Sequence, residues 1–146
     1  MTKVAIALGS NLGDRRAHLD FAIAELSKLL TDVRVSSIIE SDPLDVPDEQ
    51  PRYLNAVAVG KTNLEPEKLL EALVTIERVR GRIRKSDRAA RTLDLDIILY
   101  GDRTMHSPTL EIPHPRFRER DFVLGPLAEL EPDWVDPVTG RRVGVL

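Results

Sequence analysis

Asp94 and Asp96 stand two residues apart in the apolar stretch 91–100, which reads RTLDLDIILY. Polar residues recur there at every second position, which predicts a β-strand. Side chains alternate faces along a strand, so both carboxylates project from one face. Mg²⁺ commonly binds one or two carboxylates together with substrate phosphates. The pair predicts a magnesium site, and the alternative is a solvated strand face with two exposed acids. The opposite face, expected to anchor the strand in a core, consists of Leu93, Leu95, Ile97 and Leu99.

Positive charge is concentrated just before this strand. Positions 78–91 hold one acid, Asp87, and the following cations: Arg78, Arg80, Arg82, Arg84, Lys85, Arg88 and Arg91. Guanidinium is a planar, permanently charged fork that suits phosphate oxygens. Arginines beside a carboxylate pair predict a polyphosphate held by cations on one side and by carboxylate-bound Mg²⁺ on the other. The alternative is a solvated basic helix end, since cations are favoured at a helix C-terminus.

Other candidate ligand-binding residues lie on a strand and in the loop before it. Tyr53 and Asn55 share one face of a strand predicted over 53–60, where an amide could bind the edge of a planar heterocycle. Residues 41–51 form a proline-rich loop without secondary structure. Loops of that length inside compact domains are usually functional, so a ligand loop is slightly favoured over a plain connector.

A second cationic cluster lies near the C-terminal end of the chain. His114 stands between two prolines and is followed by Arg116, Arg118 and Arg120. A lone histidine is usually incidental, but this surrounding is consistent with contacts to an anion. Glu77, at the edge of an apolar helix stripe, would need a partner if it were partly buried.

These residues must be positioned by alternating strands and helices. Periodicity and cap signals predict elements over 3–8 (strand), 15–30 (helix, capped by Asp14), 33–40 (strand), 53–60 (strand), 66–81 (helix) and 91–100 (strand). This β-α-β-β-α-β order is the ferredoxin-like pattern, an α+β sandwich. The C-terminal extension contains an extended stretch over 110–115, a short helix over 126–130 and a tail in which Trp134 packs on the body.

Composition limits the class of protein. The 146 residues carry a net charge of −3, with 42% hydrophobic and 31% charged residues, which fits one domain over 1–146 with one core. There is no cysteine, which excludes disulfides and thiol nucleophiles. No apolar run approaches the ~20 residues of a membrane span, and the chain begins directly with a strand pattern. We therefore expect a cytoplasmic protein with no membrane partner.

Four motifs together resemble a known family. RTLDLDI at 91–97 resembles the signature of the 6-hydroxymethyl-7,8-dihydropterin pyrophosphokinase family of folate synthesis. ALGSNLG at 7–13, QPRYLN at 50–55, and IPHPR at 112–116 with FVL at 122–124 agree with it. The resemblance covers nearly the whole chain in order, and that family has a ferredoxin-like core with added elements.

The resemblance implies transfer of pyrophosphate from the co-substrate ATP to the hydroxymethyl oxygen of the pterin, with release of AMP. It implies two Mg²⁺ ions bridging Asp94 and Asp96 to the triphosphate, and a loop that closes over the reaction and carries Arg82 and Arg84. The implied catalytic residues are Arg82, Arg91, Asp94 and Asp96. The implied nucleotide-binding residues are Glu77, Arg84, Arg91, Ile97, His114 and Arg120. The implied pterin-binding residues are Ser41, Pro43, Leu44, Tyr53, Asn55 and Phe122.

Two other classes of protein are less consistent with the sequence. A ferredoxin-like RNA-binding domain needs exposed aromatics on its central strands, but aromatic residues make up only 4% of the chain, and two carboxylates would repel phosphate. A catalytically silent relative is disfavoured because Asp94, Asp96, Arg91 and His114 are all present. The expected partners are therefore small molecules and not nucleic acid, with a monomeric protein. One departure from the family pattern is DRAAR at 87–91, where relatives often carry a tryptophan.

Overall fold

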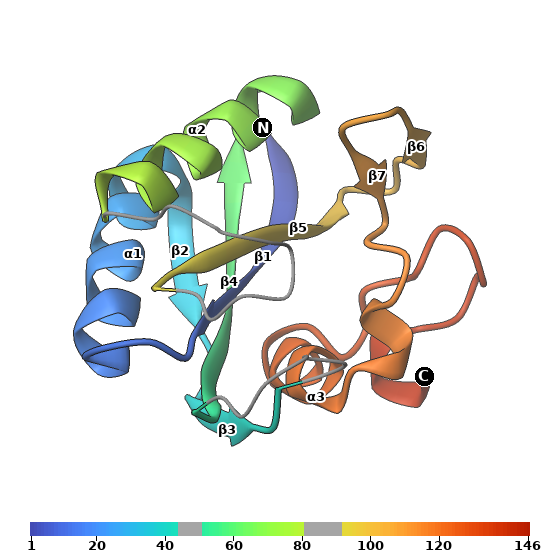
Figure 1. The fold of residues 1–146 in the computed structure, drawn as a ribbon. Helices are drawn as coiled ribbons and strands as arrows, with labels where there is room; N and C mark the ends of the chain where they lie inside the picture. Colours follow the sequence, from blue (N-terminus) through green and yellow to red (C-terminus); the bar gives the residue numbers. More distant parts are fainter. Residues whose placement is uncertain (44–50, 81–91) are drawn as a thin grey trace.

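The computed structural model describes residues 1–43, 51–80 and 92–146 (Figure 1). The first part of the chain follows the order β1 (Thr2–Ser10), α1 (Arg15–Leu29), β2 (Thr31–Val35), β3 (Ile39–Ser41), β4 (Tyr53–Thr62), α2 (Pro66–Val79) and β5 (Asp94–Tyr100). The sheet order is β2-β4-β1-β5, all antiparallel, with β3 also paired to β4. This arrangement confirms the α+β, ferredoxin-like prediction.

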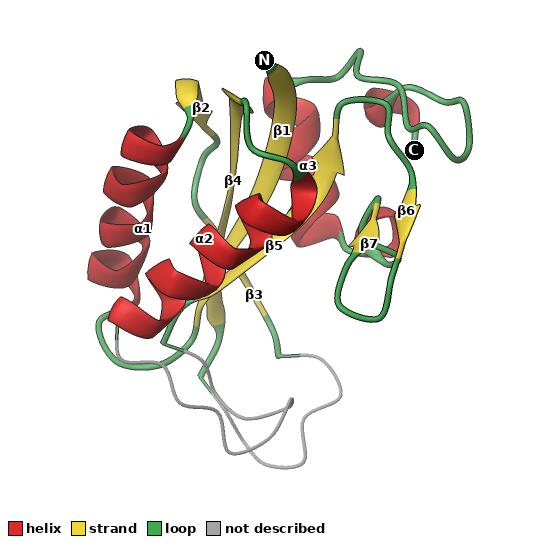
Figure 2. Cartoon of the chain, turned by 90° about the horizontal axis from the view of Figure 1, so that it is seen from above, coloured by secondary structure: helices red, strands yellow, loops and turns green. Residues whose placement is uncertain are grey.

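The C-terminal extension contributes to both apolar clusters: its hairpin residues Leu110 and Ile112 pack with the α1 and α2 side, and its helix covers the other face of the sheet. It contains the hairpin β6 (Met105–His106) and β7 (Glu111–Ile112), the 3-10 turn η1 (Phe117–Glu119), helix α3 (Asp121–Leu130) and the 3-10 turn η2 (Val143–Val145). Helices α1 and α2 lie on one side of the sheet and α3 on the other (Figure 2). None of the helices in the described parts is long and apolar enough to cross a membrane.

Each face of the sheet therefore has its own apolar cluster. Val4, Ile6 and Leu8 of β1 pack with Leu19 and Leu26 of α1 and with Leu69 and Leu73 of α2. Ala5 of β1 packs instead with Val57 of β4 and with Phe117, Val123 and Leu127 of the extension. Alternation along β1 thus sends odd-numbered residues toward α3 and even-numbered residues toward α1 and α2.

One sequence expectation about β5 is wrong. Leu95 and Ile97 lie on the face covered by α1 and α2 as expected, but Leu99 belongs to the cluster beneath α3. The ladder with β1 is irregular between Ala5 and Ile6: Ile6 pairs with Ile97, and Ala5 pairs with Leu99. The extra residue of this β-bulge is Ile98, and it reverses the alternation for the rest of the strand.

The single strand predicted over 33–40 is two short strands. Ser36 lies between them, buried, and its hydroxyl accepts the backbone N–H of Val57 at 2.9 Å. The backbone N–H of Ser37 turns away and donates to the carboxylate of Glu129 in α3. The Ser36 backbone N–H still donates to the carbonyl of Val57, but its hydroxyl replaces the strand carbonyl as acceptor, so pairing stops here and resumes at Ile39.

The helix cap and the packing of the tail agree with the sequence, whereas the helix bounds in the extension differ. Asp14 caps α1 as expected, accepting the N–H of Ala17 at 3.1 Å. The short helix expected over 126–130 begins five residues earlier, at Asp121, and carries Pro126 inside it. Proline favours a helix start, but burial of Val123 and Leu127 against the sheet extends the helix. Trp134 packs on the body as expected and donates from Nε1 to the carbonyl of Gly101.

Candidate active site

Residues from three strands meet in one cross-strand row near the end of β1. Gly9 pairs with Asp94 of β5 on one side and with Asn55 of β4 on the other. Directly paired residues share a face, so these three lie side by side on the face that α3 partly covers. The row brings together one of the predicted metal ligands and one of the predicted pterin ligands.

The second carboxylate lies on the same face, one step along the strand. Asp96 pairs with Ala7, which packs against the cluster beneath α3, while Leu95 between the two acids is buried on the opposite face. Both aspartates are half-buried. The structure therefore confirms that their side chains project from one face, as the alternation in sequence predicted.

Gly9 leaves room beside this pair. A Cβ atom at this position would lie 3.3 Å from the Cδ1 of Tyr53 and 3.7 Å from the Oδ1 of Asn55. The ring of Tyr53 and the carbonyl of the amide thus converge over the glycine. A glycine inside a strand often marks such a close approach, and here it forms the floor between the acids and β4.

The amide of Asn55 is held in one orientation by β3. Its Nδ2 donates to the hydroxyl of Ser41 at 2.8 Å and to the carbonyl of Ile39 at 3.3 Å. Both donor contacts are on the β3 side, so Oδ1 is the atom directed toward Gly9. An acceptor held in this way on a 5% exposed side chain suits recognition of an N–H on a planar ring.

Glu77 of α2 is buried against the edge of β5. Its carboxylate accepts the backbone N–H of Leu95 at 2.7 Å. Since β5 is the edge strand of the sheet in the parts of the chain that the structure describes, this N–H faces no further strand there, and the glutamate satisfies it. A buried glutamate needs a hydrogen-bond partner, and the strand that carries Asp94 and Asp96 supplies it.

His114 and Arg120 bring a polar cluster to the same face. The backbone N–H of His114 donates to the carbonyl of Ile98 at 3.0 Å, which fixes the extension to β5. Burial, together with the charge of Arg120, lowers the pKa of His114 to about 4, although Asp94 acts in the opposite direction. The imidazole is therefore neutral at pH 7.

Arg120 has an unused donor. Its guanidinium carbon lies 5.8 Å from the ring centre of Phe122, and its buried Nε has no hydrogen-bond partner within the parts of the chain that the structure describes. A buried donor without an acceptor is costly in a folded protein, so an oxygen-rich ligand at this position would be stabilised.

The other two arginines of the predicted cluster have structural partners. Arg118 makes a two-pronged contact with Asp136, with 2.8 Å between Nη2 and Oδ1, and stacks 4.6 Å from the ring centre of Phe117. Arg116 is exposed and lies 3.9 Å from Glu119. Arg120 and Arg116 both act on His114 by lowering its pKa, with Arg120 the stronger of the two.

Several predicted site residues cannot be located or reach the site only in part. Leu44, Arg82, Arg84 and Arg91 lie outside the described residues. Pro43 is described and half-buried, just after β3. Ile97 is only 3% exposed and packs on the face opposite the aspartates, so any contact with a ligand there would be made by its backbone.

These features match one family. Residues 5–132 match the family described as 7,8-dihydro-6-hydroxymethylpterin-pyrophosphokinase. The chain belongs to this pyrophosphokinase family. Its members are diphosphotransferases, and the enzyme class expected from the sequence is confirmed.

Individual relatives agree with this assignment. The chain is 44% identical over 140 residues to a 2-amino-4-hydroxy-6-hydroxymethyldihydropteridine pyrophosphokinase from Synechocystis, covering 94% of this chain and 71% of that one. It is 45% identical over 133 residues to the enzyme of the same name from Pseudomonas aeruginosa, covering 90% and 82%. It is also 45% identical over 141 residues to the folic acid synthesis protein fol1 of Pneumocystis carinii, of which it spans only 19%.

Solved structures support the fold. The HPPK-DHPS protein of Plasmodium falciparum superposes with a TM-score of 0.78 at 16% sequence identity, covering 99% of this chain and 44% of that chain. At this identity the likeness concerns the fold alone. It extends over the C-terminal extension as well as the sheet of this pyrophosphokinase.

Sequence reasoning missed the contacts made by the turn between β1 and α1. Buried Asn11 donates to the carbonyl of Pro51 at 3.2 Å, and Arg15 donates to the carbonyl of Arg52 at 2.8 Å. His18 of α1 accepts from Arg80 at the end of α2. The family motif at 7–13 indicated that this turn is important. No feature of the sequence indicated that these side chains contact residues 37 to 62 positions away.

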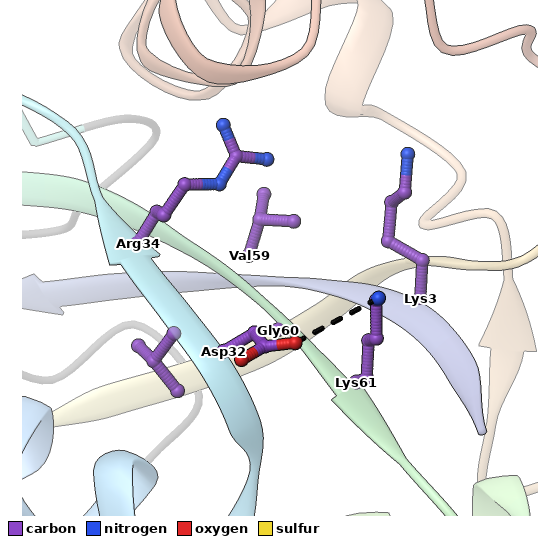
Figure 3. Close-up of a pocket in the computed structure, with 7 residues that line it drawn as sticks. Lys3, Asp32, Arg34, Val59, Gly60 and Lys61 are labelled. Carbon is purple, nitrogen blue, oxygen red and sulfur yellow. Dashed lines mark ion pairs between the residues drawn. The ribbon is translucent and has the colours of Figure 1, made fainter.

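A pocket of about 420 Å³ lies at the other end of the sheet (Figure 3). Its charged groups are largely paired: Arg34 with Glu131 at 2.9 Å, Lys3 with the same glutamate, and Lys61 with Asp32 at 3.7 Å. It contains none of the residues that the family motifs assign to substrate, and Lys3 is six positions from Gly9 along β1. Its lining is Lys3, Asp32, Val33, Arg34, Val59, Gly60 and Lys61.

Proposed function

We propose that this pyrophosphokinase transfers the terminal pyrophosphoryl group of ATP to the hydroxymethyl oxygen of 6-hydroxymethyl-7,8-dihydropterin, with release of AMP and dependence on Mg²⁺. The observation that carries the proposal is the row Asp94–Gly9–Asn55, which sets a carboxylate beside a fixed amide and an aromatic ring. The relatives named above bear the name of this reaction.

The residues present fit a magnesium site. Two carboxylates project from one face of β5, both half-buried, as Mg²⁺ prefers when phosphates and water complete its octahedron. Within the described ranges no group of three or more histidine, cysteine or acidic side chains converges as a metal site. Asp94 and Asp96 would hold the ions, up to two as the family resemblance implies. When bound, Mg²⁺ would neutralise charge that develops on the phosphate oxygens.

The chain's own residues then position the two substrates. Asn55 Oδ1 and the Tyr53 ring offer an acceptor and an apolar surface for the pterin, with Ser41 fixing the amide. Phe122, half-buried at the start of α3, offers a second ring. Pro43 and Leu44 complete this side in the proposal.

On the nucleotide side, Arg120 offers the buried donor described above and neutral His114 lies beside it. Glu77 would act on the nucleotide through the strand that it supports, and Ile97 through its backbone. As the sequence resemblance implies, the phosphate oxygens would be contacted by Arg82, Arg84 and Arg91.

The chemistry needs no covalent intermediate. The hydroxyl oxygen of the pterin forms a bond to the β-phosphorus, while the bond from that phosphorus to the oxygen bridging the α- and β-phosphates breaks. The hydroxyl proton passes to solvent, and AMP leaves with the bridging oxygen. Such a transfer depends on positioning and on neutralisation of charge, which the acids, arginines and amide can supply.

Identification of the nucleotide product tests the proposal. The protein is incubated with ATP, Mg²⁺ and 6-hydroxymethyl-7,8-dihydropterin, and the nucleotides are separated by ion-exchange chromatography. AMP formed in proportion to the pterin, and abolished by a chelator, supports attack at the β-phosphorus. Formation of ADP would mean transfer of the γ-phosphate and would overturn the proposal, as would ATP consumption that does not depend on the pterin.

Three broader properties belong to the proposal as well. We take residues 1–146 as one domain sufficient for the reaction, acting as a monomer in the cytoplasm. The two apolar clusters share a single sheet, which supports treating the chain as one unit. Only small-molecule partners are required, without nucleic acid or membrane.

A further inference from the structure

His18 and Arg80 join two elements that are 62 residues apart. Arg80 Nε donates a hydrogen bond of 2.8 Å to Nδ1 of His18, and the Arg80 guanidinium carbon lies 4.8 Å from the ring centre of Phe21, one turn further along α1. Arg80 is the residue that ends α2. Its side chain is therefore held on the surface of α1 by a directional hydrogen bond and by a cation–π contact.

The other edge of the His18 ring meets the turn between β1 and α1. The backbone of Leu12 lies near the imidazole and acts to raise its pKa. Nε2 is the nitrogen on that side, since a Cβ atom on Gly13 would lie 3.2 Å from it. Gly13 has φ +71°, so the turn passes close to the ring in a conformation that favours glycine.

These contacts require one form of the histidine. Nδ1 accepts from Arg80 and so carries no proton, and the single proton of a neutral ring then lies on Nε2. The ring is thus the neutral Nε2–H tautomer. Protonation at Nδ1 would remove the acceptor of Arg80 and would set two cations 2.8 Å apart.

The turn that His18 contacts also holds other parts of the site. Gly9, near the end of β1 just before the turn, lies between Asp94 and Asn55, and Asn11 of the turn donates to the carbonyl of Pro51 just before β4. Arg80 directly precedes positions 81–91, which carry three of the arginines assigned to phosphate. The turn therefore connects both substrate sides to the end of α2.

We infer that His18 is a positioning residue that, in its neutral form, couples the β1–α1 turn to the end of α2 and releases that coupling when protonated. The motifs that carry the family resemblance do not include it. The inference rests on the proposed function only for its kinetic consequence, because the coupling itself is a contact between described residues.

The charged groups around His18 favour the neutral ring. Burial and the charge of Arg80 lower its pKa from 6.5, and they outweigh Asp14 and the Leu12 backbone, which act in the opposite direction. The folded state thus binds a proton less readily than the unfolded chain. The stability that the contact contributes is present above pH 6.5 and is lost as the pH falls through the lowered pKa.

NMR titration of the full chain tests the coupling without any assay of activity. Nitrogen shifts of the three imidazoles report tautomer and pKa together. For His18 we expect the Nε2–H tautomer and a pKa below 6.5, and we expect Arg80→Met to raise that pKa. An Nδ1–H tautomer, or a pKa that Arg80→Met leaves unchanged, would overturn the inference even if every other variant failed to fold.

Two substitutions at His18 separate positioning from simple support of the fold. Glutamine offers an oxygen to Arg80 and an amide hydrogen toward Leu12 but does not titrate, whereas alanine offers neither. If the enzyme transfers pyrophosphate as proposed, His18→Ala should lower kcat by roughly tenfold to hundredfold with little change in KM, because misplaced groups slow a positioned reaction. His18→Gln should restore kcat, and the decrease of kcat at acidic pH should become smaller than in the unaltered protein.

A matched control uses a histidine outside the site. His106 of β6 has a 75% exposed side chain and faces Glu111, so His106→Gln should leave kcat and its pH profile unchanged. Full kcat in His18→Ala would overturn the positioning role. Absence of pyrophosphate transfer by the unaltered protein would instead overturn the proposed function, and the NMR titration would then decide the coupling by itself.

Discussion

Glu77 of α2 accepts the backbone N–H of Leu95 in β5 at 2.7 Å, directly between the two aspartates of the candidate metal site. The glutamate is 7% exposed, and among the described residues β5 has no neighbouring strand on that side. A helix side chain therefore completes the hydrogen bonding of an edge strand. The contact fixes the backbone between Asp94 and Asp96 to α2.

Removal of the Glu77 carboxylate should lower the stability of the folded protein. Glu77→Ala leaves a buried N–H without an acceptor and should lower the free energy of unfolding by about 2–3 kcal/mol, whereas Glu77→Gln retains an acceptor and should cost about 1 kcal/mol or less. Urea denaturation of the two variants measures both free energies of unfolding. The control is Glu71→Ala on the same helix, whose exposed ion pair with Lys68 should contribute little. Equal losses for alanine and glutamine would contradict the role of the hydrogen bond.

The local pattern of the sequence predicted the strand faces well. Alternation in 91–97 placed both aspartates on one face, and apolar periodicity identified both helices of the sandwich. It failed where a long-range contact decides the conformation. The bulge at Ile98 depends on pairing with β1, and the break at Ser36 depends on the N–H of Val57, which is 21 residues away.

The same limit applies to the candidate site. Asn55 and Tyr53 were identified because they share one strand face on which an amide could bind a planar heterocycle, and the structure gives their orientation through Ser41 and Gly9. Glu77 was identified only as a residue that needs a partner. The pairing of His18 with Arg80 had no local signal, since neither residue type is unusual on an exposed helix.

Loss of either metal-binding carboxylate should abolish most activity without unfolding the protein. Asp94→Asn and Asp96→Asn remove the charge on a half-buried face, so we expect the yield of AMP per unit time to fall at least about a hundredfold. Thermal unfolding should remain cooperative in both variants. Asp133→Asn, on an 84% exposed side chain, is the control and should retain activity. Full activity in either active-site variant would contradict the metal assignment.

The floor of the candidate pterin site should not tolerate a side chain. Gly9→Ala places a methyl group 3.3 Å from the Tyr53 ring, and overpacking of this kind costs about 1–3 kcal/mol. We expect a raised KM for the pterin with a smaller change in the KM for ATP, measured by steady-state kinetics. Gly125→Ala is the control, because among the described residues no atom outside its chain neighbours and its own helix backbone lies within 4 Å of the added methyl group. An increase in the KM for ATP alone would contradict the assignment of Gly9 to the pterin site.

His114 should make the protein sensitive to acid. Burial and Arg120 lower its pKa to about 4, below the ordinary 6.5, so its contribution to stability is present above pH 6.5 and is lost as the pH falls to about 4. The loss should reach up to about 3 kcal/mol. Urea denaturation without Mg²⁺ or nucleotide, repeated from pH 7 to 4, measures it. His114→Gln should show a smaller decrease over this interval, and His106→Gln should follow the unaltered protein.

The Arg118–Asp136 pair should stabilise the extension that carries the nucleotide residues. Asp136 is fully buried and accepts from Arg118, from the N–H of Val138 and from the hydroxyl of Thr139. Although burial raises the pKa of its carboxyl, hydrogen bonds from Arg118 and Val138 lower it overall, so the aspartate stays ionised in neutral solution.

Asp136→Asn would leave a partly buried arginine facing an amide and should lower the free energy of unfolding by about 2–4 kcal/mol. The surface pair of Asp133 with Arg142 offers the comparison, and Asp133→Asn should cost under about 1 kcal/mol. Because η1, which contains Arg118, lies between His114 and Arg120, the Asp136 variant should also weaken ATP binding, measured by calorimetry below its unfolding temperature. Unchanged ATP affinity with the expected loss of stability would show that the pair supports the fold but does not position these two residues.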